Sequence, residues 1–194
     1  METLEAWDRA IVLMVNGWNS PGLDHFMWIV SGKLTWFPLW LLFIYLAYRK
    51  LETKPFIAFL VCALVSIGIA DFTAAQILKE GIQRYRPSHN LLLTDHLHFY
   101  QITAKDFYKG GQYGFVSNHA ANFFAICSWV AVLFWNSKRW FVYIMLFSAV
   151  LVGFSRIYLG VHYLSDVVVG GLWGMMISYL IYRFVYLNWI ARYS

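Results

Sequence analysis

The sequence predicts an all-α integral membrane protein, a helical bundle of about five transmembrane helices with one further helix at its N-terminus. Of its 194 residues, 60% are hydrophobic and 13% are charged, whereas soluble domains carry about 25% charged residues. Aromatic residues make up 20% of the chain, and ten of them are Trp, which gathers at membrane–water interfaces. We therefore expect one membrane-embedded domain over residues 1–194, with lipid covering its outside.

Residues 3–18 form the first expected helix. Its apolar side chains recur at helical spacing and make a stripe that leaves out the charged residues Glu5, Asp8 and Arg9. The stripe consists of Leu4, Trp7, Ile11, Met14 and Trp18. The apolar stretch is too short to span, so we expect a helix that lies in the membrane interface. If it did span, the bundle would have six transmembrane helices. The Asn-Ser-Pro-Gly sequence at 19–22 ends it.

Five apolar runs then predict the spans. They cover residues 25–48, 56–78, 119–135, 140–154 and 167–187. Ser31-Gly32-Lys33 interrupts the first run, and Pro38 is a candidate kink. In the last run Gly170 and Gly174, with Gly171 between them, would let another helix approach closely.

One carboxylate and both cysteines of the chain lie inside the apolar runs. Asp71 is costly there, and is either a functional group or a buried carboxylate hydrogen-bonded to a neighbouring helix; we favour the second. Cys62 and Cys127 are expected to be buried, inert thiols.

The basic residues predict which ends of the helices share a side. Seven of the 15 Lys and Arg residues lie in two short loops and near the C-terminus, as Arg49, Lys50 and Lys54, then Lys138 and Arg139, then Arg183 and Arg192. With five spans these places share one side, which the positive-inside rule makes the cytoplasm. The N-terminal helix, the loop over 88–116 and the turn over 155–163 then share the other face. We expect that face to be the periplasmic side of a bacterial inner membrane.

Two stretches at the ends of spans could hold a phosphate. Lys79 and Arg86, followed by Pro87, are cations at a membrane boundary, and the alternative is that they merely snorkel towards headgroups. Ser117 and His119 open the third run, where a hydroxyl and free backbone N–H groups form an anion site and an imidazole could protonate a leaving group. The alternative there is a Ser N-cap beside an interfacial His.

A third stretch combines a hydroxyl, a cation, an imidazole and a carboxylate. These are Ser155, Arg156, His162 and Asp166. With a helix from Leu164 onward, Asp166 could accept the proton of one nitrogen of His162 and leave the other nitrogen free to attack. The alternative is a loop with a snorkelling Arg and a structural His–Asp pair.

Taken together, the three stretches resemble the type 2 phosphatidic acid phosphatase (PAP2) superfamily, over about residues 56–185. Its motifs Lys-x6-Arg-Pro, Pro-Ser-Gly-His and Ser-Arg-x5-His-x3-Asp are matched in order and spacing, with Gly160 at a common Gly position. Val116 and Asn118 replace the Pro and the Gly of the second motif.

The resemblance implies a hydrolase that works through a phosphohistidine and needs no metal or other cofactor. His162 would attack phosphorus, Asp166 would orient it, and His119 would protonate the leaving oxygen and then activate water. The phosphate oxygens would be held by Lys79, Arg86, Ser117, the backbone N–H of Asn118, Ser155 and Arg156. His89, Asp95, His96 and His98 in the loop could suggest a metal cluster, but headgroup recognition or solvation is favoured there.

The implied substrate is a phosphate or diphosphate of a lipid whose tail stays in the bilayer. Undecaprenyl diphosphate, phosphatidic acid, phosphatidylglycerol phosphate and the phosphates of lipid A are candidates, and the loop over 88–116 is the expected substrate loop. No nucleic acid and no obligate protein partner is expected. Two alternatives remain: a lipid phosphotransferase that uses the same phosphohistidine, and a non-enzymatic bundle that binds or transports lipid headgroups.

Overall fold

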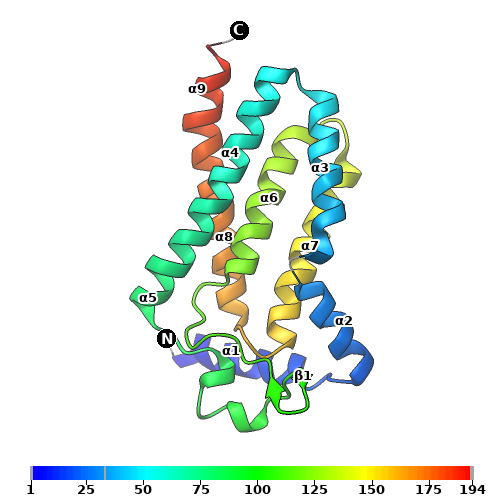
Figure 1. Cartoon of the computed structure of the whole chain (residues 1–194). Coiled ribbons are helices and arrows are strands. Elements are labelled where there is room, and N and C mark those ends of the chain that lie inside the picture. The colour runs from blue at the N-terminus through cyan, green and yellow to red at the C-terminus, as the bar shows by residue number, and fades with distance from the viewer. Residues whose placement is uncertain (1, 33, 193–194) are drawn as a thin grey trace.

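Long helices run side by side along one axis, with shorter elements gathered at one end (Figure 1). The computed structural model describes residues 2–32 and 34–192. The α-helices are α1 (Glu2–Asn16), α2 (Pro21–Ser31), α3 (Phe37–Lys50), α4 (Thr53–Phe72), α5 (Lys79–Ile82), α6 (Asn118–Phe134), α7 (Arg139–Tyr158), α8 (Leu164–Ile181) and α9 (Leu187–Ile190). A π-helical stretch, Thr73–Leu78, joins α4 to α5, and another, Tyr182–Tyr186, joins α8 to α9. A small antiparallel hairpin pairs β1 (Gln101–Thr103) with β2 (Asp106–Phe107).

The expected all-α membrane bundle is confirmed. Four of the five apolar runs each correspond to one continuous helical stretch, and the first run corresponds to α2 and α3. Three helical stretches are long and apolar enough to cross a membrane, Thr53–Ile82, Arg139–Tyr158 and Leu164–Ile190. α2 and the stretch Leu34–Lys50 could form a fourth span that is bent by 72°. α6 is apolar but has 17 residues, or about 25 Å of helix against a hydrocarbon core of about 30 Å.

Pro38, the candidate kink of the first run, does not cause the bend in this span. Pro38 lies in the first turn of α3, where its missing N–H has no helical partner to lose. The chain changes direction before α3 begins, close to the predicted interruption at Ser31-Gly32-Lys33. Lys33 itself lies outside the described residues.

α6 is the centre of the bundle and packs against α4, α7 and α8. Its Trp129 is 1% exposed, stands edge-on to Phe59 and Tyr186, and donates its indole N–H to Ser66 Oγ at 3.0 Å. The predicted close approach at the glycines of α8 is confirmed, because a Cβ on Gly174 would lie 1.9 Å from the carbonyl oxygen of Ala121 on α6. Cys62 and Cys127 are free and buried, as expected.

α1 lies across the end of the bundle rather than along it (Figure 1). Its predicted apolar stripe points away from the protein, with Leu4 63% and Trp7 68% exposed, as an interfacial helix requires. A second face, which the periodicity did not single out, packs against the bundle. It consists of Asp8, Val12, Val15 and Asn16.

The loop over 88–116 is packed onto the same end of the molecule. Leu97 and Phe99 join a small core with residues of α1 and of the α7–α8 connection. Asn16 donates its amide N–H to the carbonyl of His98 at 2.8 Å, and His98 Nε2 lies 2.9 Å from Asp24. Among the described residues no group of three or more His, Cys, Asp or Glu side chains is placed to hold a metal ion.

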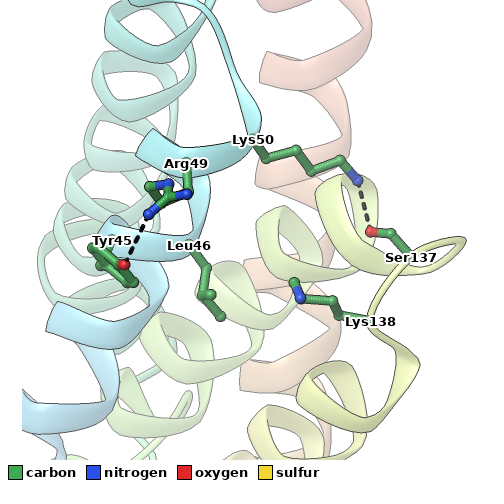
Figure 2. Close-up of a pocket in the computed structure, with 6 residues that line it drawn as sticks. All are labelled: Tyr45, Leu46, Arg49, Lys50, Ser137 and Lys138. Carbon is green, nitrogen blue, oxygen red and sulfur yellow. Dashed lines mark hydrogen bonds between the residues drawn. The ribbon is translucent and has the colours of Figure 1, made fainter.

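The two ends of the bundle differ in charge. The α3–α4 and α6–α7 turns and α9 lie at the end opposite α1 and the hairpin (Figure 1). Figure 2 shows a pocket between the end of α3 and the α6–α7 turn, where Lys50 donates to Ser137 Oγ at 2.7 Å and Arg49 donates to the hydroxyl of Tyr45 at 3.3 Å. Lys50 also donates to the carbonyl of Leu133, in the last turn of α6, where carbonyls lack helical partners.

Candidate active site

His162 lies in the tight connection between α7 and α8. Gly160, with φ +68°, takes the left-handed conformation that turns the chain there. His162 is 1% exposed, and its Nδ1 lies 3.4 Å from Asp166 Oδ2. Arg86 Nη1 donates to His162 Nε2 at 3.2 Å. Because a guanidinium only donates, Nε2 is the unprotonated nitrogen, and the ring proton is on Nδ1, facing the carboxylate.

The surroundings of His162 keep the imidazole neutral. Burial holds the pKa of His162 well below its ordinary value, and the positive charges of Arg86, Arg156 and Lys79 lower it further. A neutral ring at pH 7 keeps the Nε2 lone pair available as a nucleophile.

Asp166 is held rigidly in the first turn of α8. It is fully buried, and its Oδ2 accepts the backbone N–H of Tyr163 at 3.0 Å. Its Oδ1 accepts an N–H of Arg84 at 2.9 Å, and the same guanidinium reaches Asp8 on α1 at 2.8 Å. The carboxylate therefore cannot turn freely relative to His162.

Our prediction from the sequence missed Arg84 and Asp8. Arg84 lies inside the Lys-x6-Arg motif, two residues before Arg86, where it could have been noticed as a third cation. Asp8 lies off the apolar stripe of α1, which suggested exposure, and yet it is 2% exposed.

Lys79 and Arg86 converge without sharing a helical face. The helix ends at Ile82, where Gln83 adopts φ 52°, and Arg86 has extended backbone angles. Arg86 Nε donates to the carbonyl of Tyr113 at 2.9 Å and Nη1 donates to that of Val161 at 3.2 Å. Burial and the charge of Arg156 lower the pKa of Arg86 to about 10, so the guanidinium stays charged at pH 7.

Asn118 joins Lys79 to Asp71. Lys79 Nζ donates to Asn118 Oδ1 at 2.7 Å, and Asn118 Nδ2 donates to Asp71 Oδ1 at 3.0 Å. Asn122, one turn further along α6, donates to the same carboxylate oxygen at 2.8 Å. Asp71 is thus hydrogen-bonded to a neighbouring helix, which is the alternative that we favoured. In addition, the side chain of Asn118, which stands in place of the family Gly, positions Lys79, a predicted phosphate-binding cation.

Arg156 approaches the site from the last turn of α7 and is 3% exposed. It donates to Ser31 Oγ on α2 and, at 2.6 Å, to the hydroxyl of Tyr108 in the loop over 88–116. Ser31 and Tyr108 had no motif to mark them in the sequence. They connect Arg156, a predicted phosphate-binding residue, to α2 and to the predicted substrate loop.

The remaining predicted site residues lie at helix ends nearby. Ser117 is the N-cap of α6, and its backbone N–H donates to the carbonyl of Asp166 at 3.0 Å. Ser155 donates its hydroxyl to the carbonyl of Val152 in its own helix at 2.7 Å. His119 is half-buried in the first turn of α6. The roles of all three towards a phosphate stay predictions.

A neutral, buried imidazole backed by a carboxylate and surrounded by three cations suits phosphoryl transfer, which depends on positioning and positive charge. Its place at one end of an apolar bundle makes this a membrane-embedded enzyme site. The chain belongs to the PAP2 superfamily, whose family model matches residues 59–190. The predicted resemblance and the expected class, a membrane phosphatase, are therefore confirmed.

Curated relatives and a solved structure agree with this assignment. The lipid A 4'-phosphatase of Porphyromonas gingivalis is 30% identical over 193 residues, which is 100% of this chain and 78% of that protein. The lipid A 4'-phosphatase of Bacteroides thetaiotaomicron is 31% identical over 94% of this chain and 78% of its own length. The crystal structure of a transmembrane PAP2-type phosphatidylglycerolphosphate phosphatase from Bacillus subtilis covers 95% of this chain and 87% of its own, with a TM-score of 0.64 and 23% identity.

Proposed function

We propose that the protein hydrolyses a phosphate ester of a lipid, and that its substrate is lipid A or a similar phosphorylated glycolipid. The observation that carries the chemistry is the buried His162, with Asp166 at one ring nitrogen and Arg86 at the other. The choice of lipid is supported by the two lipid A 4'-phosphatases that match 94% or more of the chain.

The first half of the reaction forms a phosphohistidine. In the structure without substrate, Arg86 Nη1 donates to His162 Nε2. When substrate binds, its phosphate group accepts this N–H instead, and the Nε2 lone pair becomes free. Nε2 bonds to phosphorus as the bond to the ester oxygen breaks, and His119 gives that oxygen its proton. Asp166 stabilises the positive charge that develops on the imidazole ring.

The second half returns the enzyme to its starting state. His119, now deprotonated, takes a proton from water, whose oxygen bonds to phosphorus as the N–P bond breaks. Lys79, Arg86 and Arg156 balance the charge of the phosphoryl oxygens in both halves. Ser117, Ser155 and the backbone N–H of Asn118 complete the predicted set of contacts to the phosphate.

The proposed cellular setting follows from the charge of the two ends of the bundle. The basic turns at Arg49–Lys50 and Lys138–Arg139 would face the cytoplasm under the positive-inside rule, and the site would then open on the periplasmic face of a bacterial inner membrane. Residues 1–194 would act as one domain with its motif-bearing core at 56–185. The loop over 88–116, tied to Arg156 through Tyr108, would contact the headgroup.

Phosphate release from purified protein tests this function. We expect inorganic phosphate from lipid A and less from undecaprenyl diphosphate, phosphatidic acid and phosphatidylglycerol phosphate in matched detergent micelles. His162→Ala should abolish release, whereas His25→Ala, an exposed histidine at the same end of the bundle, should not. Release without any acceptor lipid separates hydrolysis from phosphotransfer. No release from any lipid, or equal activity of His162→Ala, would contradict the proposal.

A further inference from the structure

We propose that α1, which lies outside the region matched by the family model, supplies a positioning residue for the reaction. That residue is Asp8, which acts through Arg84 on Asp166 and so on His162. The inference rests on the proposed function, in which His162 attacks phosphorus.

One guanidinium bridges two buried carboxylates. Arg84 Nη2 lies 2.8 Å from Asp8 Oδ2, and Arg84 Nη1 lies 2.9 Å from Asp166 Oδ1. The carboxylate side chains are 3% and 0% exposed, and that of Arg84 is 24% exposed. The guanidinium also lies over the ring of Tyr163, 4.1 Å from its centroid. Interactions this far from water are screened little.

Ser165 provides a second connection between α1 and the same turn of α8. Its backbone N–H donates to Asp8 Oδ1 at 3.0 Å, its hydroxyl donates to Asp8 Oδ2, and Arg84 Nη1 donates to that hydroxyl at 2.7 Å. Asp8 therefore fixes both the guanidinium and the backbone that immediately precedes Asp166.

These contacts set the direction in which Asp166 points. With Oδ1 held by Arg84 and Oδ2 held by the backbone N–H of Tyr163, the plane of the carboxylate is fixed. Oδ2 is the oxygen that faces His162 Nδ1. Releasing Arg84 would let the carboxylate rotate and would weaken the contact that orients the nucleophile.

The bridge also sets the charge behind the nucleophile. Lys79, Arg86 and Arg156 all place positive charge near His162, and the ring gains positive charge as the phosphohistidine forms. Two carboxylates and one guanidinium leave one net negative charge on the Asp166 side to balance it. Neutralising Asp8 removes that net charge, whereas neutralising Arg84 doubles it.

A cycle of two single variants and their combination tests this role through kcat, KM and the pH profile. Each variant loses a hydrogen bond between charged groups that orients Asp166. We therefore expect Asp8→Asn and Arg84→Gln each to lower kcat roughly tenfold or more. KM should change little, because neither side chain belongs to the predicted phosphate contacts. The wild-type acid limb of kcat/KM should lie below pH 6.5, since only the neutral form of His162 attacks and its pKa is lowered.

The acid limb should move in opposite directions in the two single variants. Asp8→Asn makes the site more positive, so protonation of His162 needs a lower pH and the limb moves down. Arg84→Gln makes the site more negative, so the limb moves up. The double variant restores one net negative charge, and its limb should return towards the wild-type position. A merely structural anchor would change stability and yield without this pattern in the folded enzyme.

Glu5→Gln is the matched control on the same helix. It removes the exposed ion pair between Glu5 and Arg9, which lie 2.5 Å apart, and leaves the bridge intact, so kcat and the limb should stay at wild-type values. If both single variants keep the wild-type kcat and acid limb while His162→Ala is inactive, the inference fails and the proposed function stands. If His162→Ala is active, the proposed function itself has failed.

Discussion

Asn118 shows how one side chain can change what a motif does. It stands where the PAP2 motif has Gly, and it uses both ends of its amide, accepting from Lys79 and donating to Asp71. A Gly could make neither contact. The placement of Lys79 therefore depends on a residue 39 positions away, and on a carboxylate that lies within a membrane span.

Removing this amide should weaken the hold on phosphate. We expect Asn118→Ala to raise KM by roughly tenfold, because a hydrogen bond to a charged group contributes about 1.5 kcal/mol, with a smaller change in kcat. Asn122→Ala is the matched control, since it takes one donor from Asp71 but does not contact Lys79, and its KM should rise less. Steady-state phosphate release measures both. An unchanged KM in Asn118→Ala would contradict the role assigned to the side chain.

At the scale of elements, the crossing of α6 and α8 brings the second and third motifs together. A Cβ on Gly170 would lie 2.6 Å from the carbonyl oxygen of Ser117, and Gly174 has no room for a Cβ against Ala121. The two backbones can therefore touch, and the N–H of Ser117 reaches the carbonyl of Asp166 at 3.0 Å. The glycine spacing predicted a close approach, but it did not show which helix approaches.

Filling this contact should separate the two helices. We expect Gly174→Ala to destabilise the protein by about 3 kcal/mol, the cost of overpacking a contact that cannot relax, and to lower its activity. Gly68→Ala on α4 is the control, since an added Cβ there meets nothing within 4 Å. Thermal unfolding in detergent compares the two. Equal melting temperatures for Gly174→Ala and the wild type would show that the crossing can relax.

α1 is the element whose importance was least visible in the sequence. Its apolar stripe predicted an interfacial helix, and the exposed Leu4 and Trp7 fit that prediction. Asp8 lies on a different face of the helix, where it enters the interior and contacts Arg84. A hydrophobic pattern identifies the side of a helix that prefers lipid, but it does not identify a polar contact on the other side.

For the whole molecule, the separation of a basic end from the end with the site predicts how the bundle lies in a membrane. Cys62 and Cys127 are 2% and 8% exposed, so the chain gives little background with a thiol reagent. We expect a membrane-impermeant maleimide to label Lys105→Cys, in the loop over 88–116, on intact spheroplasts. Asn136→Cys, in the basic turn between α6 and α7, should react only after the membrane is permeabilised. The reverse pattern would overturn the proposed orientation.

The sequence by itself determined the class of the protein and its helical fold, and it supplied the predicted residues of the site. Apolar runs reflect the thickness of a bilayer, and the motif residues reflect the chemistry of a phosphate, so both can be recognised from residue type and spacing. Tertiary structure decided how the site is supported. Asp8 and Asp166 meet at Arg84 across 76 and 82 positions of sequence, and Asn118 joins two residues of another helix. Local spacing carries no information about such contacts, because they depend on which helix faces pack together.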